Sequence, residues 1–164
     1  LAFLSPKIKQ IYAGVKLIFS ETETIVSGSW EFNKDSMEWG LAGDTVNTSD
    51  IQMCDKLTLV AEILLHAVFD HSGNDITAEF INLDDNYANS VLSRAIKDCK
   101  VIYEWRITDH DTVNRMKNAS NCYGFDGKIF SAYSTKWYLG FYPNGSRLSR
   151  IGTCSIFLNL AGVF

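Results

Sequence analysis

Alternation of apolar and polar residues is the dominant pattern along this chain. Apolar residues occupy every second position in Val101–Ile107, Ile11–Phe19, Leu57–Leu65 and Lys136–Tyr142. This period is typical of half-buried strands. Shorter strands are predicted at Ser29–Phe32, Lys128–Tyr133 and Cys154–Leu160, and turn residues such as Pro143-Asn144-Gly145 separate the strands. Short strands of this kind predict an all-β fold, an antiparallel β-sandwich.

One stretch has a different period. From Asp84 to Cys99 the apolar residues fall three and four apart, which predicts an amphipathic helix. Residues 71–100 are therefore interpreted as a linker that carries one helix. No internal repeat is evident.

The two ends of the chain have the pattern of a domain interior. A predicted strand, Cys154–Leu160, is followed by apolar residues 161–164, and the first strand, Ile11–Phe19, follows an apolar start. Unpaired strands at a sheet edge promote aggregation. We therefore expect residues 1–70 and 101–164 to complete each other, within one chain or between chains.

Composition narrows the classes of partner. The 164 residues fit one domain, and a net charge of −4 argues against a nucleic-acid-binding surface. No apolar run is long enough to suggest a membrane span. The four cysteines are widely spaced, which predicts free thiols and a cytoplasmic or nuclear protein. Glycosylation sequons at Asn47, Asn118 and Asn144 leave a secreted protein open.

Candidate catalytic and metal-binding residues are few. His66 and His71 are an odd number of residues apart, so on one strand they face opposite sides. Asp109-His110-Asp111 is interpreted as a solvated turn. Signatures of nucleophilic hydrolases and of nucleotide-binding loops are absent from the sequence. We expect no enzyme activity, no metal and no cofactor.

Read with residues 101–164 before residues 1–70, the sequence resembles a TRAF-like, or MATH, domain. The motifs that carry the resemblance are, in family order, Tyr103-Glu104-Trp105-Arg106-Ile107, Trp137 through Gly145, Ser155-Ile156-Phe157-Leu158, Trp39-Gly40, and Asp55-Lys56-Leu57-Thr58-Leu59. The resemblance implies an eight-stranded antiparallel sandwich. The rotated order implies either a circular permutant or two half-domains from a tandem array.

The pattern is most similar to the MATH domains of speckle-type POZ adaptors. By that resemblance, a shallow groove would bind an extended peptide through Trp39, Phe157, Leu41, Trp30 and Val15, with the acidic residue Glu38 beside the tryptophan. Trp105 and Trp137 are predicted to pack in the core. Gly140, Met37 and Ala42 stand where the adaptors have basic residues, which implies a more apolar peptide.

Three functions follow from these patterns. The first is a non-catalytic module that binds partner peptides, within an adaptor for ubiquitination whose other domains are not in this sequence. The second is a structural module that assembles into homo-oligomers by exchange of half-domains. The third is a secreted carbohydrate-binding sandwich that uses Tyr138 and Tyr142.

Overall fold

The computed structural model describes residues 8–77, 100–133, 135–147, 149 and 152–161. Within these ranges the chain forms two helices, α1 (Thr48–Gln52) and α4 (His110–Lys117), and nine strands. The strands are β1 (Ile8–Phe19), β2 (Thr24–Phe32), β3 (Glu38–Asn47), β4 (Leu57–Asp70), β5 (Lys100–Ile107), β6 (Phe125–Asp126), β7 (Phe130–Ala132), β8 (Thr135–Tyr142) and β9 (Thr153–Leu160).

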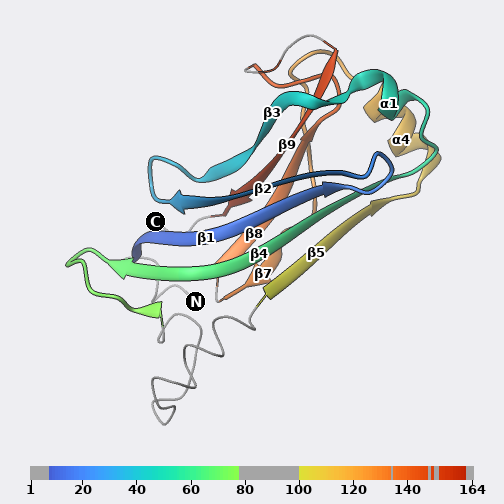
Figure 1. Cartoon of the computed structure of the whole chain (residues 1–164). Coiled ribbons are helices and arrows are strands. Elements are labelled where there is room, and N and C mark those ends of the chain that lie inside the picture. The colour runs from blue at the N-terminus through green and yellow to red at the C-terminus, as the bar shows by residue number, and fades with distance from the viewer. Residues whose placement is uncertain (1–7, 78–99, 134, 148, 150–151, 162–164) are drawn as a thin grey trace.

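The strands form two antiparallel sheets that face each other (Figure 1). Sheet A has the order β2-β1-β4-β5. Sheet B has the order β3-β9-β8-β6, and β7 also pairs with β8. This arrangement confirms the all-β antiparallel sandwich predicted from the alternation.

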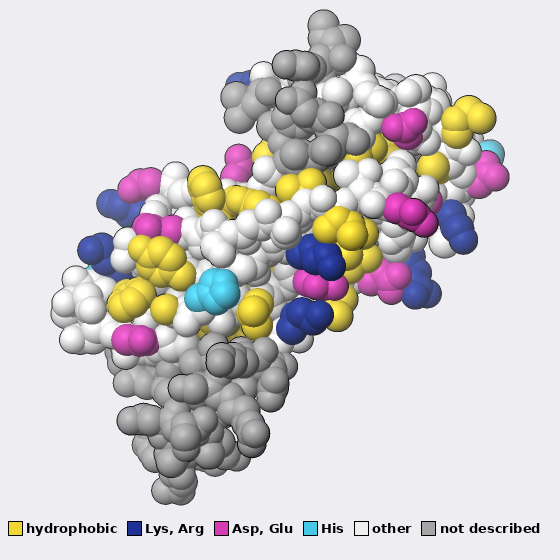
Figure 2. All heavy atoms as spheres, in the orientation of Figure 1, with side chains coloured by type: hydrophobic (Ala, Val, Ile, Leu, Met, Phe, Trp, Pro, Cys, Tyr) yellow, Lys and Arg dark blue, Asp and Glu magenta, His cyan; other side chains and the backbone are white. Residues whose placement is uncertain are grey.

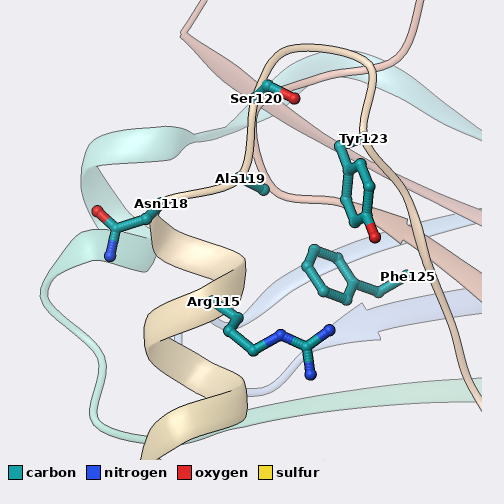
Figure 3. Close-up of a pocket in the computed structure, with 6 residues that line it drawn as sticks. All are labelled: Arg115, Asn118, Ala119, Ser120, Tyr123 and Phe125. Carbon is teal, nitrogen blue, oxygen red and sulfur yellow. The ribbon is translucent and has the colours of Figure 1, made fainter.

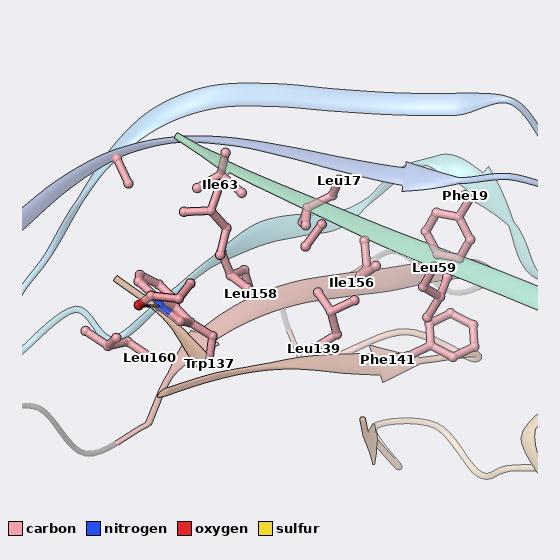
Figure 4. Close-up of a cluster of buried hydrophobic side chains, with 14 of the residues drawn as sticks. Leu17, Phe19, Leu59, Ile63, Trp137, Leu139, Phe141, Ile156, Leu158 and Leu160 are labelled. Atoms are coloured by element: carbon pink, nitrogen blue, oxygen red, sulfur yellow. Dashed lines mark hydrogen bonds between the residues drawn. The ribbon is translucent and has the colours of Figure 1, made fainter. Parts of the chain in front are cut away.

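The core lies between the sheets and is built from the apolar half of each alternating strand (Figure 4). Leu139 and Phe141 of β8 point toward side chains of sheet A, and Phe19 meets Phe141 with ring centroids 5.6 Å apart. Trp137 is fully buried, as predicted, and its indole Nε1–H donates to Thr135 Oγ1 at 2.7 Å. That bond satisfies the polar atom that burial removes from water.

Strands from both parts of the chain lie side by side in both sheets. In sheet A, β4 pairs with β5 from Leu57↔Ile107 to Leu64↔Lys100. In sheet B, β3 pairs with β9 from Glu38↔Asn159 to Ala42↔Ser155. Strands of the two parts of the chain therefore pair with each other within one chain.

Both helices lie at the same end of the sandwich (Figure 1), where the Gln52 amide donates to the Lys117 carbonyl at 2.8 Å. Asp109 caps α4 by accepting the Thr112 N–H at 2.8 Å. Residues 109–111 are exposed to solvent, as predicted, but they form the start of α4 and its cap where a turn was predicted. The helix predicted at 84–99 lies outside the described residues. No helix in the described ranges is long and apolar enough to cross a membrane.

Candidate functional site

The candidate site is the free edge of β3, the outermost strand of sheet B. Within the described residues β3 forms strand pairs only with β9. The Leu160 N–H donates to the Met37 carbonyl at 2.8 Å, and antiparallel bonding alternates along the strand. The main-chain groups of Trp39 therefore point to β9, whereas those of Glu38 and Gly40 point away from it. This row of outward donors and acceptors is a template for another strand.

Trp39 lies on the inner side of this edge. It pairs with the core residue Leu158 and packs partly buried against the core. A Cβ placed on Gly28 of β2 would lie 3.0 Å from Trp39 Cζ2, so the indole reaches from sheet B to the edge of sheet A. Trp30 follows two residues later on the same face of β2, 40% exposed, and donates its Nε1–H to Ser36 Oγ at 3.1 Å. The two tryptophans thus gather where the edges of the two sheets meet.

Val15 lies beneath this pair of tryptophans. It pairs with Gly28 across β1 and β2, and only 3% of it is exposed. Val15 is therefore part of the core and is closed to a ligand on the surface. The structure corrects its predicted role as a groove residue: because it faces inward on a central strand, it supports the site from below.

Phe157 lies on the opposite face of sheet B from Trp39. Successive residues of a strand alternate in direction, and Phe157 is next to Leu158, the residue that pairs with Trp39. Gly40 and Gly140 flank Phe157 on the neighbouring strands, and the Tyr142 ring meets it edge to face at 5.8 Å. The family resemblance predicted that Trp39 and Phe157 line one groove, but the structure does not bring them together. They lie on opposite faces of sheet B.

The glycine in the Trp39-Gly40 pair has a geometric cause. A Cβ at Gly40 would lie 2.1 Å from the Ile156 carbonyl oxygen and 2.6 Å from Phe157 Cα. Strands β3 and β9 approach too closely for any side chain at this position. Leu41 follows Gly40, and its backbone pairs with Ile156; its side chain lies outside the described part of the structure.

Glu38 is exposed at the start of β3, on the same face as Phe157. It borders an open hollow of about 540 Å³. The hollow is lined by Lys34, Asp35, Ser36, Met37, Glu38, Tyr138, Asn159 and Leu160. Burial raises the pKa of the Tyr138 phenol, and the charges of Asp126 and Glu38 raise it further. This end of the site therefore combines an aromatic ring with charges of both signs, from Lys34, Asp35 and Glu38.

The outer face of sheet A is less suited to a ligand. Glu62 is bonded there to Lys16 and Lys100, with N–O distances of 3.9 and 3.5 Å. The face seen in Figure 2 mixes hydrophobic, acidic and basic side chains without one continuous apolar area. Its charges are largely satisfied within the protein, whereas the outward main chain of β3 pairs with no other strand in the described part of the chain.

The described residues contain no cluster of metal-binding side chains. Among them, no three His, Cys, Asp or Glu side chains lie close enough together to hold a metal ion. Cys54, Cys122 and Cys154 are free thiols. Burial raises the pKa of the Cys154 thiol to about 12, so this cysteine is not a nucleophile at neutral pH.

Comparison of the chain with protein-family models, with curated proteins and with solved structures finds no match. The likeness to TRAF-like domains therefore rests on the sequence motifs. The function must be argued from the geometry of the β3 edge.

Proposed function

We propose that this sandwich is a non-catalytic protein-interaction module that binds an extended peptide as an added strand on β3. The observation that carries the proposal is the outward main chain of Glu38 and Gly40 at a sheet edge. Main-chain bonds of this kind supply affinity in strand addition, and pockets for alternate side chains supply specificity. The apolar groups on the two faces of this edge differ in exposure: Trp30 is 40% exposed and Trp39 is partly buried on one face, whereas Phe157 on the other face is only 8% exposed.

The opposed faces fit a bound strand well. Side chains of an extended peptide alternate in direction, as they do in any strand. One set would pack toward Trp39 and Trp30, and the next toward the face of Phe157 and Tyr142.

We also propose that the chain is a TRAF-like sandwich in rotated order. The support is that its motifs occur in the family's order once the two parts of the chain are exchanged. Recruitment of partners for ubiquitination would then belong to a longer adaptor. The absence of basic residues at 37, 42 and 140 favours apolar peptides. Peptide binding requires no exchange of half-domains, because strands of both parts pair within one chain.

The test is selection of extended peptides from a random library, followed by affinity measurement on Glu38→Pro and Glu38→Ala. Proline removes the outward N–H of Glu38 and is tolerated on edge strands, because that N–H is not bonded to β9. Alanine removes the same side chain but keeps the N–H. We expect Glu38→Pro to lower affinity about tenfold and Glu38→Ala to retain most of it.

Two outcomes would contradict strand addition. One is the absence of any enriched peptide with a folded wild-type protein. The other is an equal loss in Glu38→Pro and Glu38→Ala, since that would assign the effect to the carboxylate and leave the main chain without a role. Circular dichroism of each variant, compared with wild type, controls for misfolding.

A further inference from the structure

A second pocket lies at the other edge of sheet B, between α4 and the residues that lead into β6 (Figure 3). Its volume is about 360 Å³. It is lined by Arg115, Asn118, Ala119, Ser120, Tyr123 and Phe125. Because the strand order of sheet B is β3-β9-β8-β6, this pocket and the β3 edge lie at opposite edges of the sheet.

Arg115 supplies an unpaired cation to this pocket. Val113 and Met116 anchor α4 in the core, and Arg115 extends along the helix toward Phe125 (Figure 3). Its guanidinium carbon lies 6.0 Å from the centre of the Phe125 ring, within the range of a cation–π contact. Within the described residues the guanidinium takes part in none of the ion pairs, which use Lys16, Lys100 and Arg106. Its planar fork of N–H donors is therefore available to a ligand.

Tyr123 supplies an exposed aromatic wall. It is 53% exposed, and its ring meets Phe125 at 5.2 Å with an interplanar angle of 68°. Tyrosine and arginine are among the residues enriched at the energetic centres of protein interfaces. The Arg115–Phe125–Tyr123 group thus has the composition of a docking site.

The backbone of this pocket is held in place before any ligand arrives. The Cys122 N–H donates to the Gly145 carbonyl at 3.0 Å, and the Tyr123 N–H donates to the Ser120 carbonyl at 3.1 Å. The Asn144 amide donates to the Ala119 carbonyl. These bonds fix the loop that carries Tyr123, so little ordering cost remains to be met on binding.

The charge of the pocket favours an anion. Arg115 is its one charged lining residue, whereas Lys117, two positions further along α4, does not line the pocket. Asp126 is next to Phe125 in sequence but projects from the other face of β6. It pairs with Gly140, whereas Phe125 pairs with the inward-facing Phe141.

We propose that this pocket is a second docking site, which binds an acidic and apolar segment of a partner protein. A carboxylate of the partner accepts hydrogen bonds from the Arg115 guanidinium. A neighbouring apolar side chain packs on Tyr123 and Phe125. The site is independent of strand addition on β3, because the two share no residue.

The test uses two probe peptides on the full chain, one of alternating glutamate and leucine and one with glutamine at each glutamate position. Amide chemical shifts are followed in wild type, in Arg115→Gln and in the matched control Lys117→Gln. The control loses the same charge from the last turn of α4, at a residue that does not line the pocket. We expect the glutamate peptide to shift the signals of residues 115–125, with affinity about tenfold lower in Arg115→Gln and nearly unchanged in Lys117→Gln.

Several results would overturn the proposal. These are an equal response to the glutamine peptide, an equal loss in Lys117→Gln, or no shift around Tyr123 at millimolar peptide. Loss of the response in Glu38→Pro with retention in Arg115→Gln would place the acidic peptide on β3 instead. Conversely, a response that survives Glu38→Pro supports this site whether or not peptides add to β3.

Discussion

Replacing Gly40 by alanine tests how closely β3 and β9 are paired. The new Cβ would lie 2.1 Å from the Ile156 carbonyl oxygen, 2.6 Å from Phe157 Cα and 2.9 Å from the Ile156 carbonyl carbon. All three are backbone atoms, which a rotamer change cannot move. Overpacking costs about 1–3 kcal/mol, and we expect the upper end, about 3 kcal/mol, because the strands must separate. In a chain of this size that lowers the midpoint of thermal unfolding by about 6–12 °C.

Gly140→Ala is the matched control, because Gly140 flanks the same Phe157 from the other neighbouring strand. Its new Cβ would meet Asn159 Nδ2 at 3.2 Å and Asp126 Oδ1 at 3.5 Å. These are the ends of side chains that can rotate away, so the cost is less than about 1 kcal/mol. Thermal unfolding followed by circular dichroism measures both variants. Equal shifts in the two midpoints, or a larger shift in Gly140→Ala, would refute the close pairing of β3 with β9.

Three further predictions concern the core, a thiol and a helix cap. Leu139→Ala removes a fully buried side chain between the sheets, and we expect a loss of about 2–5 kcal/mol in urea unfolding. A thiol reagent should label exposed Cys122 in the native protein and Cys154 only after unfolding. Because the pKa of Cys154 is raised from 9.0 to about 12, its contribution to stability is present below pH 9.0 and is lost as the pH rises toward 12. Cys154→Ala should flatten that slope. Asp109→Ala should lower the midpoint of thermal unfolding, whereas Asp109→Asn should retain the cap. Hydrogen bonds from Thr112 lower the pKa of Asp109. The stability that the carboxylate contributes is therefore present above pH 3.8 and is lost as the pH falls through the lowered pKa.

The alternation of residues was sufficient to predict the strands that have one face in the core. β1, β5, β8 and β9 begin and end within a few residues of their predicted bounds. β4 was predicted to stop at Leu65 but continues to Asp70, since its register with β1 shifts at a bulge and the alternation is broken there. Sequence alone does not reveal such a bulge.

Two elements, β3 and α4, have sequence patterns that are too weak to predict them. β3 begins with Glu38-Trp39-Gly40, where a glycine interrupts the side-chain pattern, and it was not predicted as a strand. α4 is mostly polar, and only Val113 and Met116 are buried. The sequence nevertheless contained a signal for the start of α4. Asp109 is a residue type preferred at the N-cap, and its side chain accepts a hydrogen bond from the Thr112 N–H.

The arrangement of the candidate site could not be predicted from the sequence. Trp39, Trp30 and Phe157 all lie close to the β3 edge, yet the faces they occupy depend on the register between β3 and β9. A shift of one residue would exchange those faces. Arg115 and Tyr123 had no sequence signal, because a helix and a loop bring them together only in the fold.

The pairing of β3 with β9 also has a consequence for how the protein is made. Glu38 meets Asn159 across most of the length of the chain, and contacts between distant residues slow folding. During synthesis β1, β2 and β4 can pair early, because short connections join β1 to β2 and the β1–β4 ladder closes before β5 is made. β3 must remain without its partner until β9 emerges from the ribosome. The nascent chain therefore exposes the strand beside Trp39 while the residues between β3 and β9 are made, and a chaperone that shields extended apolar segments is expected to act on it at that stage.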